Sequence, residues 1–335
     1  MHTPPPASDA PDSPPRRDSR SPGGDRKALW GLLLCVAAAL GYSVVNACLR
    51  KLTDDCDRVL VVFIKELVTV LVVGPWLAVS ALRGRRIMPG NRALAALAVA
   101  GLMTQLGGNL PNVWAFSVLG LAVAIPIMSG TNMVATAVLG RVFLGERVSR
   151  RTVAAIGLLF VSILLLRMAA GPSGRAPVGL SLATLAVLAS CCAGIVYAIL
   201  VVVIRRTVTH DTPVSAVLFM VTVMGVVSLG PWLALHGGLD VFLDTALSDH
   251  ALMWFAGLLN LLAFVAFTHG LQWTRAAHAN TIMTSQVVLA AVFGAALFDE
   301  RISLGIVLGV CLTTIGMILI GREVRLEPET PETPI

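Results

Sequence analysis

Long apolar stretches separated by short polar segments make up most of the chain. We count ten stretches, each long enough for a tilted helix to cross the roughly 30 Å hydrocarbon core of a bilayer. The stretches are Ala28–Leu49, Val59–Leu82, Ala93–Val118, Leu121–Leu144, Thr152–Met168, Val178–Ile204, Pro213–Leu235, Ala251–Trp273, Ala276–Phe298 and Ser303–Ile320. The pattern predicts an all-α membrane protein with ten transmembrane helices.

The second half of the chain repeats the first half at an offset of 154 to 156 residues. Three short matches carry the repeat: Gly74-Pro75-Trp76-Leu77-Ala78 returns as Gly230-Pro231-Trp232-Leu233-Ala234, Glu146-Arg147-Val148-Ser149 returns as Glu300-Arg301-Ile302-Ser303, and Tyr42 returns as Tyr197. Such self-similarity indicates two copies of one structural unit. We assign residues 28–168 and 178–321 to the two units. Because each unit holds five helices, an odd number, the second must enter the membrane from the opposite side, which predicts two inverted five-helix repeats.

The segments outside the repeats, residues 1–27 and 322–335, are polar and contain Pro, so we expect two disordered tails. With the N-terminus in the cytoplasm, most Lys and Arg of the short loops fall on the cytoplasmic side, as the positive-inside rule requires. We therefore expect both tails to be cytoplasmic, in a protein of the cell inner membrane.

Composition limits the class of protein and the partners that the chain can have. Hydrophobic residues make up 56% of the chain and charged residues only 13%, which fits a bilayer and not an ordinary soluble domain. The net charge of +6 is spread over short loops and forms no basic face, so we expect no nucleic-acid partner. The cysteines lack CxxC spacing, and His236, Asp240, Asp244, Asp249 and His250 are irregularly spaced, which favours a solvated acidic loop. We expect no metal and no cofactor.

The two Glu-Arg-hydrophobic-Ser turns, at Glu146 and Glu300, the Phe63-Ile64-Lys65 start of the second helix and the repeat offset together resemble the drug/metabolite transporter superfamily, EamA-type. The resemblance extends from Trp30 to Gly321. It implies a carrier of small molecules, such as metabolites, amino acids, nucleotide-linked sugars or drugs, with the lipid bilayer and a small-molecule substrate as its partners. The two glutamates would cap the following helix or pair with the adjacent Arg.

Polar residues recur at helical spacing inside four of the apolar stretches. In inverted-repeat carriers the substrate site lies near the membrane midplane, between the repeats, so we expect these residues to face inward and contact substrate. The alternative is that each one only joins two helices by a hydrogen bond worth about 0.6 kcal/mol. The candidates are Tyr42 and Asn46, Gln105, Asn109 and Asn112, Asn132 with Ser129 and Thr136, and His278, Thr281 and Ser285 with Gln286 beside them.

Lys65 and Glu66 are adjacent opposite charges inside the second stretch, whereas the equivalent positions of the second repeat hold Val221 and Thr222. The fold therefore does not require charges there, and a charge within a membrane span is a functional candidate by default. Adjacent side chains project about 100° apart on a helix, so we expect each charge to find a separate partner. Glu66 would carry a coupling proton or bind a cationic substrate, while Lys65 could instead reach the headgroups.

These observations favour a secondary-active transporter, not an enzyme, that exports small metabolites by alternating access. A membrane-embedded transferase acting on lipid-linked groups is the first alternative, although HExxH and GxSxG motifs are absent from the sequence. A non-transporting membrane scaffold is the second alternative. Gly305, Gly309 and Thr313, four residues apart, predict close helix packing within the chain or, alternatively, in a homodimer.

Overall fold

We describe the protein from a computed structural model that places residues 22–84, 90–144, 150–169, 180–207, 214–273 and 276–323, and all described elements are helices. The first unit contains α1 (Pro22–Asp55), α2 (Arg58–Leu82), α3 (Asn91–Met103), the π-helix η1 (Thr104–Asn109), α4 (Leu110–Leu119), α5 (Leu121–Leu139), the π-helix η2 (Gly140–Leu144) and α6 (Arg150–Ala169). The second unit contains α7 (Leu180–Thr207), α8 (Val214–Leu235), α9 (Gly238–Asp244), α10 (Leu247–Trp273), α11 (Ala276–Met283), α12 (Ser285–Phe298) and α13 (Leu304–Glu323).

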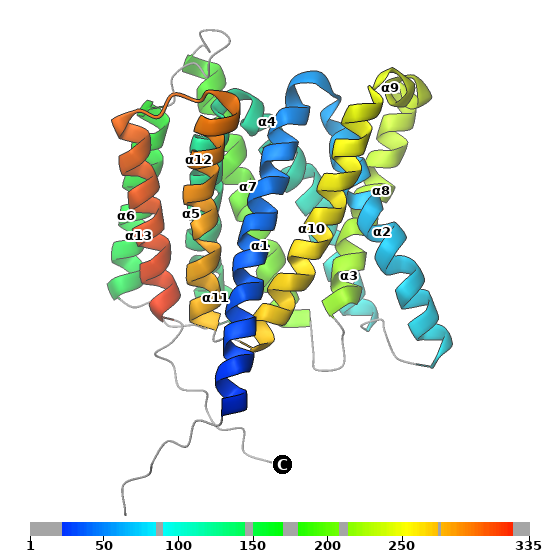
Figure 1. The fold of residues 1–335 in the computed structure, drawn as a ribbon, viewed down its shortest axis with the longest axis horizontal. Coiled ribbons are helices and arrows are strands. Elements are labelled where there is room, and N and C mark those ends of the chain that lie inside the picture. The colour runs from blue at the N-terminus through cyan, green and yellow to red at the C-terminus, as the bar shows by residue number, and fades with distance from the viewer. Residues whose placement is uncertain are drawn as a thin grey trace, which may run out of the picture.

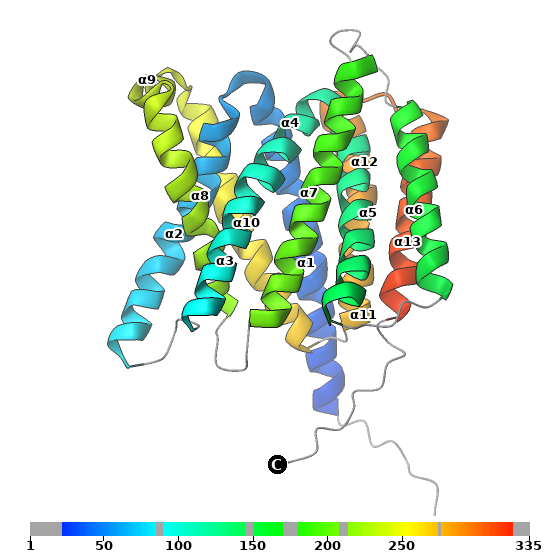
Figure 2. The same ribbon diagram turned by 180° about the vertical axis from the view of Figure 1, so that it is seen from behind.

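The long helices stand side by side in one bundle, and the two units run through it in opposite directions. Figures 1 and 2 show that α1 starts at the end of the bundle that α13 reaches last, whereas α7, the first helix of the second unit, starts at the opposite end. Helix α1 packs against α10 and α12, and α7 packs in the corresponding way against α3, α4 and α5. Helices of the two units are therefore interleaved.

Two equivalent contacts between α2 and α8 show how the units are related. A Cβ atom added to Gly74 would lie 3.1 Å from Cε2 of Phe219, and one added to Gly230 would lie 3.2 Å from Cε2 of Phe63. Gly74 and Gly230 are equivalent in the repeat, as are Phe63 and Phe219. Each ring thus lies on the glycine of the other unit, which is the reciprocal contact that a two-fold relation between the units produces.

The helices differ from the predicted stretches in several places. Nine helices of the described part of the chain are long and apolar enough to cross a membrane, and Leu304–Ile320 is a shorter apolar helix. The third stretch contains a π-helical turn, and the ninth is interrupted between α11 and α12. Helix α9 was not predicted, and α1 begins at Pro22, inside the segment expected to be a disordered tail. The remaining tail residues, 1–21 and 324–335, lie outside the described residues.

The stripe of small residues on α13 packs against α6 of the same chain. A Cβ atom at Gly309 would lie 2.5 Å from Cγ of Leu166. The hydroxyl of Ser162 donates to the Gly309 carbonyl at 2.6 Å and lies 2.6 Å from the Thr313 hydroxyl. This contact confirms internal packing, and it occupies the surface that a homodimer through the same stripe would need.

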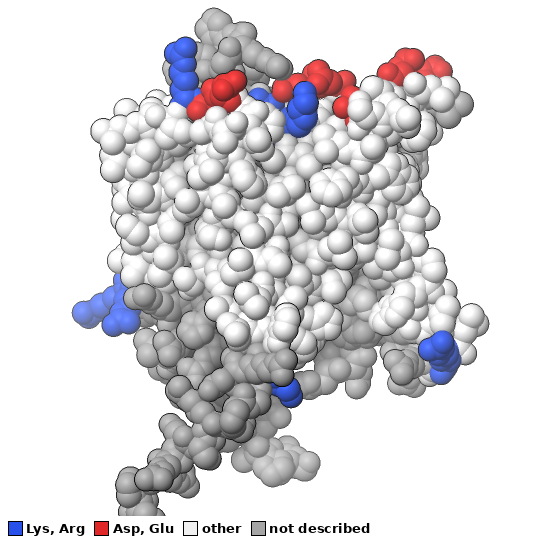
Figure 3. Space-filling view, viewed as in Figure 1, with Lys and Arg blue, Asp and Glu red and all other residues white. Residues whose placement is uncertain are grey.

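The two ends of the bundle differ in charge, as Figure 3 shows for one face. The end with the turns α1–α2, α8–α10 and α12–α13 carries both signs of charge, and its acidic residues, which include Asp54, Asp55, Asp57, Asp240, Asp249 and Asp299, outnumber basic ones such as Lys51, Arg58 and Arg301. The end near the start of α1 carries the basic residues Lys27, Arg83, Arg92, Arg141, Arg150 and Arg206. We call the first the acidic end and the second the basic end.

Candidate functional site

The charged residues of α2 form a buried ion pair. Helix α2 begins after Asp57, whose carboxylate accepts hydrogen bonds from the amides of Val59 and Leu60. Glu66 follows Arg58 by eight residues, or about 12 Å along the helix axis, which places it within the span, about a third of the way along α2. Lys65 and Glu66 are 7% and 4% exposed, and Lys65 Nζ lies 3.1 Å from Glu66 Oε1.

This pair corrects the expectation that each charge would find its own partner. The Cα–Cβ bonds of adjacent residues do point about 100° apart, but the four-carbon stem of Lys65 bends far enough to reach its neighbour. In a medium of low dielectric constant, an unpaired charge costs several kcal/mol more than a paired one. The gain from pairing therefore exceeds the cost of bending one flexible side chain.

Three uncharged side chains extend the pair into a hydrogen-bonded network. The amide nitrogen of Asn109 donates to Glu66 Oε1 at 3.1 Å and to Gln105 Oε1 at 2.6 Å. The hydroxyl of Tyr197 donates to the Asn109 carbonyl at 2.6 Å, and Gln105 Nε2 donates to the main-chain carbonyl of Val221 at 3.3 Å. We call Lys65, Glu66, Gln105, Asn109 and Tyr197 the central network. It joins α2 and η1 of the first unit to α7 and α8 of the second.

Glycines make room for the central network. The side-chain amides of Gln105 and Asn109 belong to η1, a π-helical segment that also contains Gly107 and Gly108. Such segments are frequent at functional sites. A Cβ atom at Gly108 would lie 3.2 Å from the ring of Tyr197. On α8, a Cβ atom at Gly225 would lie 2.8 Å from Cγ of Glu66 and 3.0 Å from Cδ of Gln105. A larger side chain at Gly225 would therefore displace Glu66 or Gln105.

The central network lies where the two units meet. A Cβ atom at Gly101 would be 3.1 Å from Cα of Val221, and one at Gly257 would be 3.2 Å from Cα of Lys65. These two contacts are equivalent in the repeat, as Lys65 corresponds to Val221 and Gly101 to Gly257. The same backbone positions thus approach each other on both sides, but only one side carries charges.

Four of the twelve predicted candidates, namely Lys65, Glu66, Gln105 and Asn109, meet in the central network. Asn112 is buried nearby on α4, and its carbonyl oxygen has no hydrogen-bond partner among the described residues. Within the described part of the chain, no hydrogen bond connects Asn112 to the central network. It is the third member of the predicted stripe, but the π-helical turn at η1 changes the angular spacing on which that stripe was based.

The remaining candidates lie elsewhere. Tyr42 and Asn46 are half-buried on α1, and Asn132 accepts a hydrogen bond from Thr136 at 3.3 Å on α5. Around the break between α11 and α12, Ser285 and Gln286 are half-buried and Gln286 Nε2 lies 3.8 Å from Sδ of Met283. Thr281 is exposed, against the expectation that it faces inward. The side chain of His278 is outside the described part of the structure.

Sequence reasoning missed Tyr197 as a site residue. The chain has only two tyrosines, and they occupy equivalent positions in the two units, Tyr42 on α1 and Tyr197 on α7. A buried phenol needs a hydrogen-bond partner, so a tyrosine inside an apolar span is itself a signal of a polar neighbour. That signal could have identified Tyr197, but only the fold determines that Asn109 is its partner.

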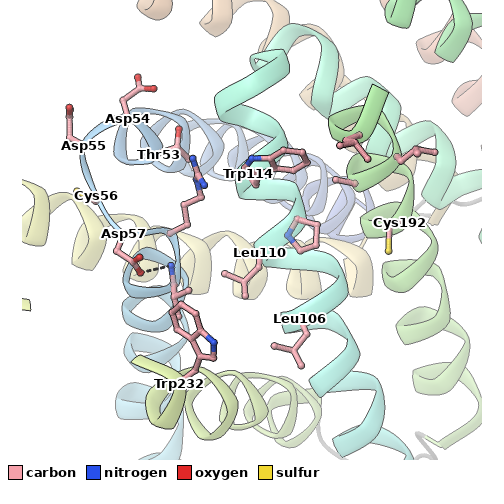
Figure 4. A pocket seen from close by; sticks show the side chains of 16 residues that line it. Thr53, Asp54, Asp55, Cys56, Asp57, Leu106, Leu110, Trp114, Cys192 and Trp232 are labelled. Atoms are coloured by element: carbon pink, nitrogen blue, oxygen red, sulfur yellow. Dashed lines mark hydrogen bonds between the residues drawn. The ribbon is translucent and has the colours of Figure 1, made fainter. Parts of the chain in front are cut away.

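Figure 4 shows a groove at the acidic end. Its volume is about 1000 Å³, and it lies between the end of α1, the start of α2, the segment η1–α4, α7 and the end of α8. The rim carries carboxylates and the walls are mainly apolar, the lining residues including Asp54, Asp55, Asp57, Leu106, Leu110, Trp114, Leu188 and Trp232. Leu106 and Leu110 directly follow Gln105 and Asn109 in the sequence. The groove and the central network therefore share one helical segment.

Glu300 lies at the acidic end and connects the two units. Its carboxylate accepts hydrogen bonds from the amides of Leu121 at 2.9 Å and Ala122 at 3.0 Å, at the start of α5. The Nε atom of Arg50 lies 3.9 Å from Glu300 Oε1. The expectation that Glu300 caps the following helix or pairs with the adjacent Arg301 was wrong, because the fold brings the distant α5 and α1 to this turn. Glu146 lies outside the described residues.

Gly120, just before α5, makes this contact with Glu300 possible. Its φ angle is +75°, and a Cβ atom there would lie 2.5 Å from the Glu300 carboxylate. Burial raises the pKa of Glu300, and the two backbone hydrogen bonds and the charge of Arg50 partly oppose that rise. The carboxylate also lies at a helix N-terminus, where a negative charge is favoured.

Metal-binding geometry is absent from the described residues, among which no group of three or more His, Cys, Asp or Glu side chains is placed to hold an ion. The central network offers a different chemistry: one ammonium, one carboxylate, two amides and one phenol, of which Lys65, Glu66 and Gln105 are buried and Asn109 and Tyr197 are half-buried. Such groups can hold a small polar solute by hydrogen bonds and charge.

Comparisons with known proteins agree with this architecture. No curated protein sequence matches the chain. Among solved structures, one described as "Crystal structure of protein" matches over 91% of this chain and 99% of that chain, with a TM-score of 0.53 and 16% identity, which shows a shared fold alone. The sequence model of the EamA-like transporter family matches residues 29–168 and again residues 184–322. Because the two matches fall on the two units of the bundle and together span most of the sequence, the chain belongs to the EamA-like transporter family, whose members carry small molecules across membranes.

Proposed function

We propose that the protein is a secondary-active transporter that moves a small polar metabolite across the cell inner membrane by alternating access. The observation that carries the proposal is the central network, a buried ion pair with its polar hydrogen-bond partners at the boundary between two inverted units. Sites of this kind lie near the midplane in carriers built from inverted repeats. Buried charges that the equivalent positions of the second unit lack are best explained by substrate binding.

Glu66 has a different role in this proposal from that of a proton carrier. Its carboxylate is 4% exposed and already faces the ammonium group of Lys65 at 3.1 Å. The positive charge of Lys65 thus already balances the negative charge of this carboxylate. We therefore assign Glu66 to substrate binding, with Asn109 and Tyr197 orienting the side chains around it.

The groove at the acidic end supplies the route on that side. Its volume of about 1000 Å³ exceeds that of a small metabolite, and it ends on the helical segment that carries Gln105 and Asn109. The basic end faces the cytoplasm under the positive-inside rule, so both termini are cytoplasmic and the groove opens outward. We propose export as the direction of transport.

The experiment is transport by the purified full-length chain in proteoliposomes, with a panel of labelled neutral, cationic, anionic and zwitterionic small solutes. We expect at least one solute to move faster than in protein-free vesicles, and Asn109→Leu to reduce that rate about tenfold or more while the protein stays folded and monodisperse. Thr222→Val on α8 is the matched control and should keep the parent rate. Direction is determined by comparing vesicles with the chain inserted in each orientation.

Parent rates equal to those of protein-free vesicles for the whole panel would refute the transporter proposal. In that case a membrane-embedded transferase or a scaffold becomes the better explanation. A parent that transports a solute while Asn109→Leu transports it equally fast would keep the function but remove the central network from it.

A further inference from the structure

We propose that Lys65 is a tethered counter-ion for Glu66, and that the substrate is a zwitterion that opens this ion pair. The ammonium group of the substrate binds Glu66, and its acid group binds Lys65. The inference rests on the proposed transport function and specifies the substrate class of the same site.

The central network is electrically neutral, and this limits the charge of the substrate that it can bind. The central network holds one positive and one negative side chain, both more than nine-tenths buried, so its net charge is zero. A solute that carries one charge would leave a net charge inside the protein, at a cost of several kcal/mol. A zwitterion adds no net charge and offers one partner to each side chain. Among charged solutes, it is the class that matches this site.

The geometry leaves capacity for a second ligand on both side chains. Lys65 and Asn109 both contact the same oxygen of Glu66, Oε1. A carboxylate can accept hydrogen bonds on both oxygens, and an ammonium group has three donors, so Oε2 and further N–H groups of Lys65 are available to a substrate. Asn109 is held by Tyr197 and Gln105, so it keeps Glu66 in position while Lys65 moves away.

The tethered counter-ion also has a consequence for the empty carrier. A lone buried carboxylate needs a proton or a cation whenever the site is empty, because an unpaired charge inside the membrane is costly. Lys65 supplies that charge from within the chain. Among the described residues, the side chains that contact Glu66 or its hydrogen-bond partners are Lys65 on α2, Gln105 and Asn109 on η1 and Tyr197 on α7, and α8 contributes Gly225. The empty parent carrier therefore needs no coupling proton at Glu66.

The first test uses matched trios of solutes with the parent protein in proteoliposomes. Each trio contains a zwitterionic amino acid, its methyl ester, which is a cation at a pH well below the pKa of its amine, and its N-acetyl derivative, which is an anion, and all are assayed at that pH. We use trios built on leucine, glutamine and phenylalanine, with glycine betaine as a zwitterion of fixed charge. Zwitterions should move at least about tenfold faster than either singly charged derivative. Equal rates for a zwitterion and its ester or its N-acetyl derivative would overturn the proposal.

The second test removes one charge at a time. Lys65→Met should shift the preference from the zwitterion to the ester, and should make transport respond to an imposed proton gradient that the parent ignores. Glu66→Gln should shift the preference to the N-acetyl derivative. Each shift in relative rate should be about tenfold or more, and Thr222→Val should show none. Lys65→Met with an unchanged order of preference would contradict the assignment of Lys65.

The two proposals fail in different ways. A parent that carries an uncharged or singly charged member of the solute panel, but none of the zwitterions, is a transporter whose site does not open as we infer. A parent that carries nothing from the panel or the trios fails as a transporter. The trio test uses the unmodified protein, so poor folding of a variant does not affect it.

Discussion

Helices α2 and α8 occupy equivalent places in the two units, yet only α2 carries charges. Their packing is the same, with Phe63 against Gly230 and Phe219 against Gly74. Two and three residues after these phenylalanines, α2 has Lys65 and Glu66, whereas α8 has Val221 and Thr222. The comparison separates the residues that the fold requires from those that the function requires. The repeated residues build the bundle, and the residues that differ between the repeats are the best candidates for function.

The largest expected effect comes from erasing this difference. The double substitution Lys65→Val with Glu66→Thr gives α2 the residues of α8. We expect transport to fall about a hundredfold or more, while the free energy of unfolding stays the same or rises by about 1 to 4 kcal/mol, because an apolar replacement removes the cost of burying two charges. Proteoliposome transport and thermal unfolding in detergent measure the two effects.

Glu66→Val alone is the control for that prediction, because it leaves the Lys65 ammonium buried without its partner. We expect this single variant to be about 3 to 5 kcal/mol less stable than the parent. If the single and the double variant are equally stable, the ion pair does not determine the energy of this region.

The next effect concerns a contact that crosses between the units. Glu300→Ala removes the acceptor for the amides of Leu121 and Ala122 at the start of α5, and should lower the free energy of unfolding by about 2 to 4 kcal/mol. The neighbouring Arg301→Ala should change stability by less than about 0.5 kcal/mol. Chemical denaturation of both variants measures the difference, and equal effects would contradict the assignment of the cap to Glu300.

Glu300 should also make the stability of the protein depend on pH. Burial raises the pKa of Glu300 above its ordinary value of 4.5. Because the pKa is higher in the folded than in the unfolded protein, the contribution of this carboxyl to stability is complete below the unfolded pKa and is lost as pH rises through the folded pKa. The Tm of the parent relative to Glu300→Gln should therefore fall as pH rises above 4.5. A constant difference in Tm would show that this pKa is not raised.

A smaller effect sharpens the comparison between α2 and α8. Phe63→Leu and Phe219→Leu remove equivalent ring contacts, so each should lower the free energy of unfolding by about 1 kcal/mol, and the two losses should agree within about 0.5 kcal/mol. The double variant should show their sum only if the two contacts are independent. A large difference between the single variants would show that the reciprocal packing is unequal in energy.

The smallest perturbation tests the inverted arrangement without altering packing. The turn with Cys56 joins α1 to α2, and Val214 starts α8 in the inverted unit. In a variant without the other cysteines, a membrane-impermeant maleimide should reach Cys56 from outside the cell but miss Val214→Cys. Burial and Asp249 raise the pKa of Cys56 to about 11, so labelling should be slow at neutral pH and should accelerate as pH rises. Labelling of Val214→Cys from outside would contradict the orientation.

Much of the fold could be predicted from hydrophobic runs and the internal repeat, because long apolar stretches and their spacing are properties of the sequence alone. The candidates Gln105 and Asn109 were found from helical spacing. Their partners were not, since the Tyr197 and Val221 contacts depend on how α7 and α8 cross η1. The pairing of Lys65 with Glu66 was missed because side-chain direction was considered without the reach of a long, flexible lysine.

The cap formed by Glu300 has a consequence for biogenesis. Leu121 and Glu300 are 179 residues apart, so at roughly 5 to 20 residues per second the ribosome needs about 10 to 35 seconds to make the acceptor after the donor. During that interval the first amides of α5 have no carboxylate to bind, and unsatisfied amides are costly within a bilayer. The start of α5 must therefore remain near water until the last turn of the second unit arrives. Completion of the first unit thus depends on synthesis of the turn that follows α12.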